Sequence, residues 1–82
     1  TDFQCALGIS QLRKLDKFVT LRRNIAKFYN QRFKGNPYFN LPVEKDYAYN
    51  SYHLYPIRLK EKFLPHKGEI FKSLRRVGLG VQ

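Results

Sequence analysis

Few residues of this chain could do chemistry, and the most suggestive are the neighbours Tyr52 and His53. Flanked by Tyr52 and Tyr55, His53 could line a pocket and bind a substrate oxygen. A histidine among aromatic residues is more often packed and hydrogen-bonded in the wall of a core. Both interpretations stay open here, and Tyr52 and His53 are the candidate substrate-side residues.

Other chemical constellations are weaker. The five glycines are scattered, so no phosphate-binding loop is present. One cysteine and two distant histidines, His53 and His66, cannot make a zinc site. A nucleophile–base pair of Cys5 with His53 is conceivable, but the apolar surroundings of Cys5 favour a small packed residue in a reduced, cytosolic protein. We therefore expect no catalytic residue and no metal site.

Composition limits the class of protein. The chain has 82 residues, enough for one small domain or for a piece of a larger one. Its hydrophobic fraction of 43% argues against disorder, and no apolar run is long enough to span a membrane. The net charge of +10 suits an anionic partner such as nucleic acid. The basic residues are nevertheless spread along the whole chain, as on a solvated surface or in a basic segment of a larger protein.

An amphipathic pattern covers residues 1–34. Its apolar residues recur at steps of three, four and seven, which predicts one long helix or two helices joined end to end. Thr1 and Gln4 have the form of a capping box. A straight helix of this length would be roughly 50 Å long, so we expect a bend, either at Gly8 or within residues 14–16.

The remainder of the chain mixes strands and a helix. Residues 38–43 are expected to be extended or an edge strand, residues 44–50 a surface loop, and Ser51–Leu59 a strand. An apolar stripe at Ile70, Phe71, Leu74 and Val77 predicts a second helix, which Gly78 and Leu79 would close as a Schellman motif. This order of elements predicts an α+β fold with a small sheet covered by helices.

Two stretches together resemble a known family. The first is TDFQCALGISQLRKLD at residues 1–16, followed by RRNIA at residues 22–26. The second is YHLYPIRL at residues 52–59, followed by a helix and by Gly-Leu-Gly at residues 78–80. In order and spacing, essentially the whole chain resembles the sugar aminotransferases of the DegT–StrS type. Those are pyridoxal-phosphate enzymes of the aspartate aminotransferase fold.

The resemblance implies a piece of a longer enzyme. Residues 1–35 would be the linking helix, and residues 36–82 the first part of the C-terminal small domain. The Schiff-base lysine, the other cofactor groups and the large domain that carries them would lie outside this chain. We therefore expect no cofactor-binding residue here and no activity from the 82 residues alone.

The resemblance also implies a function for the whole enzyme. It would pass an amino group, with glutamate as the expected donor, to a nucleotide-linked keto sugar in bacterial cell-surface glycan biosynthesis. The nearest branch acts on UDP-linked 4-keto-6-deoxy amino sugars in pseudaminic acid biosynthesis. Such an enzyme would be a cytoplasmic homodimer with no membrane partner, in which this segment supplies scaffold and subunit interface. The alternative, from a different class, is a small basic nucleic-acid-binding module.

Overall fold

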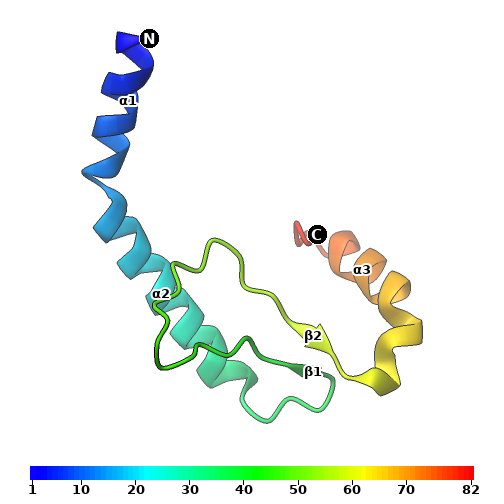
Figure 1. The fold of residues 1–82 in the computed structure, drawn as a ribbon. Helices are drawn as coiled ribbons and strands as arrows, with labels where there is room; N and C mark the ends of the chain where they lie inside the picture. Colours follow the sequence, from blue (N-terminus) through cyan, green and yellow to red (C-terminus); the bar gives the residue numbers. More distant parts are fainter. The chain divides into compact units, whose positions relative to one another are not determined.

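A computed structural model describes residues 1–82 and shows an α+β chain, which confirms the predicted class. Figure 1 shows its elements. They are α1 (Asp2–Leu12), α2 (Leu15–Phe33), β1 (Phe39–Asn40), β2 (Arg58–Leu59), the 3₁₀ helix η1 (Glu61–His66) and α3 (Lys67–Arg76). The chain forms two compact units, the first made of residues 1–34 and 43–55, the second of residues 35–42 and 56–82.

The amphipathic region of the first unit is two helices joined end to end, as one of the two alternatives predicted. The Thr1 hydroxyl accepts from the Gln4 backbone N–H at 3.2 Å, and the Gln4 side chain reaches back to the Thr1 amino group, so the capping box is confirmed. The break falls at residues 13–14, where the Lys14 N–H donates to the Gln11 carbonyl in a tightened last turn. Gly8 lies inside α1 and causes no bend.

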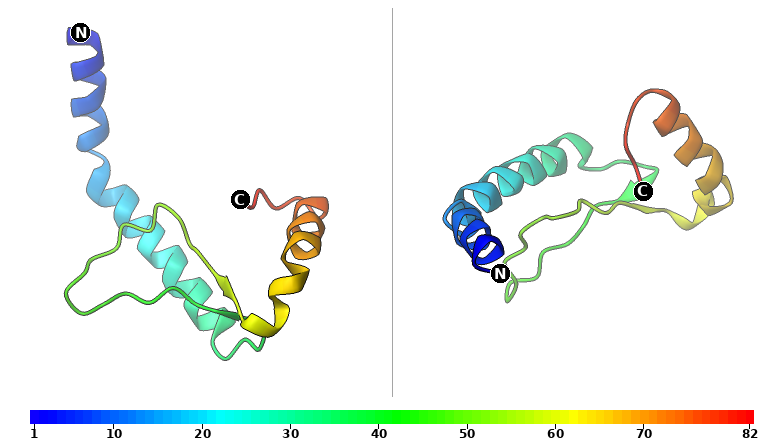
Figure 2. Two further views of the ribbon diagram at one scale, coloured as in Figure 1. Left: turned by 45° about the vertical axis from the view of Figure 1, so that its right-hand side comes forward. Right: turned by 90° about the horizontal axis from the view of Figure 1, so that it is seen from above.

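Residues 43–55 complete the first unit without regular secondary structure. A turn at residues 46–47 lies in the predicted surface loop, and the Ala48 N–H donates to the Lys45 carbonyl at 2.9 Å. Side-chain contacts attach this segment to α2. We call residues 43–55 the return segment (Figure 2, where it is green to yellow-green).

The second unit is built on a two-stranded antiparallel ribbon. Phe39 pairs with Leu59 and Asn40 with Arg58, and the Lys60 N–H donates to the Tyr38 carbonyl at 2.9 Å. The edge strand expected at residues 38–43 is therefore present, although it is short. The strand predicted for Ser51–Leu59 is wrong except for its last two residues. Tyr52 has a positive φ of 52°, which no strand accommodates, and Pro56 has no N–H for a ladder.

The second helix follows the prediction more closely. η1 contains Pro65 and leads directly into α3. At the end of α3, Gly78 has φ +98° and its N–H donates to the Arg75 carbonyl, while the Leu79 N–H donates to the Leu74 carbonyl at 3.0 Å. These two bonds are the Schellman closure. Residues 80–82 do not form a strand.

Very little of the chain is buried. Ala26, on α2, is the one buried side chain, with 3% of its surface exposed. Phe3 is 82% exposed and Leu12 67% exposed, so the apolar face of α1 lies open. Cys5 is also exposed, which corrects the expectation of a packed cysteine, because no other element covers α1. No helix in the structure combines the length and the apolar character that crossing a membrane requires.

Gly78 provides a test of the α3 closure. Alanine there meets no neighbouring atom, so Gly78→Ala should cost only the left-handed backbone conformation, about 1 kcal/mol. Hydrogen exchange at the Leu79 amide should become about fivefold faster. Gly80→Ala is the matched control, because Gly80 has equally open surroundings and no positive φ. Equal effects of the two variants would contradict the Schellman closure.

Candidate functional site

An ion pair attaches the return segment to the middle of α2. The Arg23 Nη1 lies 2.6 Å from Glu44 Oε2, and Nη2 donates to Glu44 Oε1 at 3.0 Å. The two side chains are 25% and 26% exposed, so solvent screens them only in part. Two parallel N–H···O bonds fix direction as well as distance. The ion pair therefore sets how the return segment lies on the helix.

Asn50 closes the ion pair into a three-residue cluster, which we call the Arg23–Glu44–Asn50 node. The Asn50 N–H donates to Glu44 Oε2 at 2.8 Å, and the Asn50 carbonyl accepts from Arg23 Nη1, also at 2.8 Å. The Arg23 guanidinium also lies over the Tyr49 ring, 3.8 Å from its centroid. The node thus combines charge-assisted hydrogen bonds with a cation–π contact.

The node is locked in its charged form. The hydrogen bond from Arg23, and after it the one from the Asn50 N–H, lowers the pKa of Glu44 from 4.5 to about 2. The hydrogen bond to Glu44 in turn raises the pKa of Arg23. Neither group can exchange a proton usefully near neutral pH. The node is therefore an anchor and not an acid–base pair.

Tyr52, one of the two predicted site residues, is held in place by the node. Its N–H donates to Asn50 Oδ1 at 2.8 Å, which is the bond of an Asx turn. Its positive φ of 52° costs roughly 1–2 kcal/mol and persists only because its surroundings hold it. The half-buried Tyr52 ring lies 5.9 Å from the Arg23 guanidinium and 6.4 Å from the Tyr55 ring.

His53, the other predicted site residue, is exposed and makes no hydrogen bond. The packed interpretation of His53 is therefore wrong for this chain. Tyr52 and His53 are adjacent on the return segment. The ionisable side chains near the Tyr52 ring, Arg23 and Tyr55, are already engaged by Glu44 and Asn30. Among the described residues no group of acids, histidines and cysteines could hold a metal ion.

A second attachment lies at the end of the return segment. The Tyr55 hydroxyl donates to Asn30 Oδ1 at 2.6 Å, and its ring meets Tyr29 edge-on at 5.1 Å. Tyr29 in turn stacks on Phe33 at 5.7 Å. Burial raises the pKa of the Tyr55 hydroxyl. The return segment is thus fixed at two points, one polar and one aromatic.

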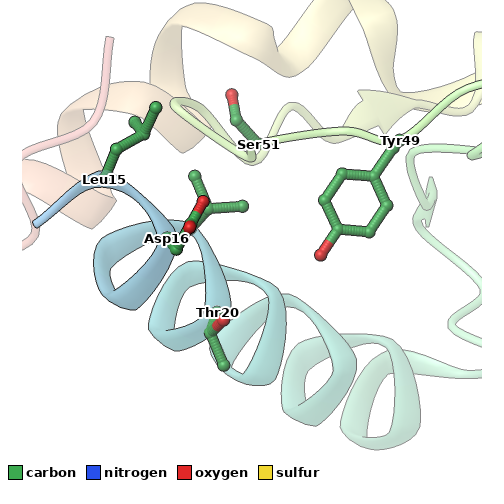
Figure 3. A pocket seen from close by; sticks show the side chains of 6 residues that line it. Leu15, Asp16, Thr20, Tyr49 and Ser51 are labelled. Atoms are coloured by element: carbon green, nitrogen blue, oxygen red, sulfur yellow. The ribbon is translucent and has the colours of Figure 1, made fainter. Parts of the chain in front are cut away.

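Between the node and the start of α2 lies a shallow groove of about 430 Å³. Figure 3 shows Leu15, Asp16 and Thr20 on the helix, facing Tyr49 and Ser51 on the return segment. Its only ionisable side chains are those of Asp16 and Tyr49. Pyridoxal phosphate requires a lysine for its Schiff base and donors for its phosphate. No lysine lines the groove, so the groove does not fit that cofactor.

Sequence reasoning missed the node. Arg23 was one of many spread basic residues, and Glu44 lies 21 positions away. No local spacing rule connects residues so far apart. The one available signal was Glu44, the first acidic residue after a strongly basic helix, followed two positions later by Asp46.

Comparison with known proteins decides the family. The model of the DegT/DnrJ/EryC1/StrS aminotransferase family matches residues 1–82, the whole chain. The chain belongs to the DegT/DnrJ/EryC1/StrS aminotransferase family. The resemblance carried by the two sequence stretches is therefore confirmed. No solved structure matches the chain.

Several relatives are named as nucleotide-sugar enzymes. The UDP-4-amino-4,6-dideoxy-N-acetyl-beta-L-altrosamine transaminase of Campylobacter jejuni is 50% identical over the whole chain, and its Helicobacter pylori counterpart is 41% identical over 99% of the chain. The GDP-perosamine synthase of Vibrio cholerae is 31% identical over 90% of it. The chain spans only 20–22% of the length of these relatives.

The lowered pKa of Glu44 predicts how the stability of the fold changes at acid pH. Because the folded pKa lies below the ordinary value, the ion pair stabilises the fold fully above about pH 4.5, and this contribution is lost as the pH falls towards 2. Titration of the Glu44 carboxyl carbon by NMR should give a midpoint near 2. In an Arg23→Gln variant the midpoint should rise towards 4.5. An unchanged midpoint would show that Arg23 does not hold this carboxylate.

The aromatic attachment can be tested separately. Tyr55→Phe keeps the ring contact with Tyr29 but removes the hydrogen bond to Asn30, so the free energy of unfolding should fall by about 1 kcal/mol. Tyr47→Phe is the control, since Tyr47 is 88% exposed and its hydroxyl makes no hydrogen bond. Chemical denaturation measures the free energy of unfolding of both variants. A Tyr55→Phe variant as stable as the control would contradict the role of the hydroxyl.

Proposed function

We propose that this chain is a scaffold segment of a nucleotide-sugar aminotransferase. In this proposal, residues 1–35 form the helix that links the large and small domains, and residues 36–82 begin the small domain. The observation that carries the proposal is a family match over all 82 residues, together with 50% identity to a sugar transaminase of which the chain spans 22%.

The proposed acceptor is a UDP-linked 4-keto-6-deoxy amino sugar, and glutamate is the proposed amino donor. Three relatives named as UDP-4-amino-4,6-dideoxy-N-acetyl-beta-L-altrosamine transaminases are 41–50% identical to the chain. Three relatives named for GDP-sugars are 28–31% identical. This order favours a UDP-sugar of the kind expected for pseudaminic acid biosynthesis. The cytoplasmic location expected from the sequence stays a prediction.

The family implies pyridoxal phosphate as the cofactor of the whole enzyme. That group supplies an electron sink for amino transfer. Because no lysine lines the groove, we propose that the cofactor is held elsewhere in the enzyme and that these 82 residues contribute structure. Tyr52 and His53 are the proposed substrate-side residues of this segment.

The open apolar faces support a scaffold role. Phe3, Leu7 and Leu12 of α1 are each more than half exposed. Exposed apolar area of this extent marks a surface that another part of a protein covers. We propose that the large domain or the second subunit of a homodimer covers it. The nucleic-acid alternative has no support among the relatives, and Arg23 is engaged by Glu44.

The proposal is tested on the complete protein that contains this segment, purified with pyridoxal phosphate. It should transfer the amino group of glutamate to a UDP-linked 4-keto-6-deoxy amino sugar, detected as a 4-amino product by mass spectrometry. The GDP-linked analogue should react more slowly. Absence of transfer to every nucleotide sugar, combined with DNA binding that weakens steeply with salt, would favour the nucleic-acid module instead.

A further inference from the structure

We propose that Arg23 is a positioning residue for the sugar nucleotide. It acts through Glu44 and Asn50 to hold Tyr52 and His53 in the conformation that contacts the substrate. This inference rests on the proposed function, and it adds a role for a residue that acts through its bonds to Glu44 and Asn50.

The Arg23 side chain is held rigidly. Arg23 lies in the middle of the 19-residue helix α2, where backbone hydrogen bonds fix its Cα. Its guanidinium makes three hydrogen bonds, two to the Glu44 carboxylate and one to the Asn50 carbonyl. The Tyr49 ring at 3.8 Å covers one face of the same guanidinium. The node is thus a fixed point on an otherwise irregular segment.

The node fixes the conformation of Tyr52 through Asn50. The node holds Asn50 by its backbone, since the Asn50 N–H and carbonyl are both bonded within it. This leaves the Asn50 side chain to accept from the Tyr52 N–H. That bond lies inside the turn that keeps Tyr52 at its positive φ. Tyr52 is the only residue other than glycine with a positive φ in residues 1–82.

The turn presents the side chains of Tyr52 and His53 to a ligand. His53 follows Tyr52 directly, is exposed and makes no hydrogen bond, so its imidazole can meet a ligand. The Tyr52 hydroxyl and the His53 ring N–H are both hydrogen-bond donors suited to sugar hydroxyl or carbonyl oxygens. The direction in which they point depends on the turn. The turn in turn depends on the node.

The neighbouring arginine provides a matched control. Arg22 has the same charge as Arg23 and lies on the same helix, but it is exposed and takes part in no hydrogen bond or ion pair. A general effect of charge on the substrate would involve both arginines. The proposed role belongs to Arg23 alone.

Two substitutions separate positioning from simple attachment. Arg23→Gln dissolves the node. Asn50→Ala keeps the backbone bonds of Asn50 to Arg23 and Glu44, and with them the ion pair, but removes the side-chain bond to Tyr52. If Arg23 only fastened the return segment, Asn50→Ala would have no effect on substrate binding. Asn50→Ala also keeps the test decisive if Arg23→Gln does not fold.

The experiment measures steady-state kinetics of the complete protein with a UDP-linked keto sugar and glutamate. Arg23→Gln and Asn50→Ala should each raise the KM for the sugar nucleotide about tenfold, the loss expected for one hydrogen bond to an ordered group. Cofactor absorbance and the KM for glutamate should stay unchanged. Arg23→Lys should behave like Arg23→Gln, because one ammonium cannot reproduce the fork.

The control Arg22→Gln should match the wild-type protein in every constant. An unchanged sugar-nucleotide KM in Asn50→Ala overturns the positioning role, whether or not Arg23→Gln raises that KM, as does an equal rise in Arg22→Gln. Equal loss of cofactor and of both substrates also overturns it, since that shows general damage. A wild-type protein that transfers no amino group to any nucleotide sugar overturns the proposed function itself, and the positioning role with it.

Discussion

The bidentate ion pair of Arg23 with Glu44 fixes the return segment to α2 in the first unit. With Ala26 as the one buried side chain, there is no hydrophobic core to hold residues 43–55 against α2. The polar contacts of the node and the aromatic contact of Tyr55 with Tyr29 do so instead. The polar contacts are directional, so they define one geometry where a small apolar contact would permit several. The strained turn at Tyr52 persists because this geometry is defined.

The apolar faces of α1 and α2, in contrast, are largely uncovered. Hydrophobic residues make up 43% of the chain, yet side chains such as Phe3 and Ile25 remain more than half exposed. A hydrophobic stripe stabilises a protein only when another surface removes it from water. In a chain that spans about a fifth of its relatives, that surface is proposed to come from the remaining four fifths or from a second subunit.

Local features of the fold could be predicted from sequence, and distant ones could not. The Thr1–Gln4 capping box and the Schellman closure at Gly78 each depend on residues a few positions apart, and both were correct. The strand predicted for residues 51–59 failed because a mainly apolar run looks the same whether or not a partner strand exists. The left-handed conformation of Tyr52 depends on Asn50 and, through it, on an arginine in another element.

The same distinction applies to the candidate site. Tyr52 and His53 could be named from their types, and the family from two motifs, but Arg23 could not be distinguished from Arg22 without coordinates.

The residues of this chain are proposed to form a covered scaffold that positions a substrate-side turn. A crystal structure of the complete protein with a UDP-sugar bound tests it most directly. The account predicts that Phe3, Leu7 and Leu12 are covered, that the Arg23–Glu44 pair is intact, and that the sugar nucleotide contacts Tyr52 or His53. An α1 face still open to solvent, with the nucleotide sugar bound far from the return segment, would contradict it.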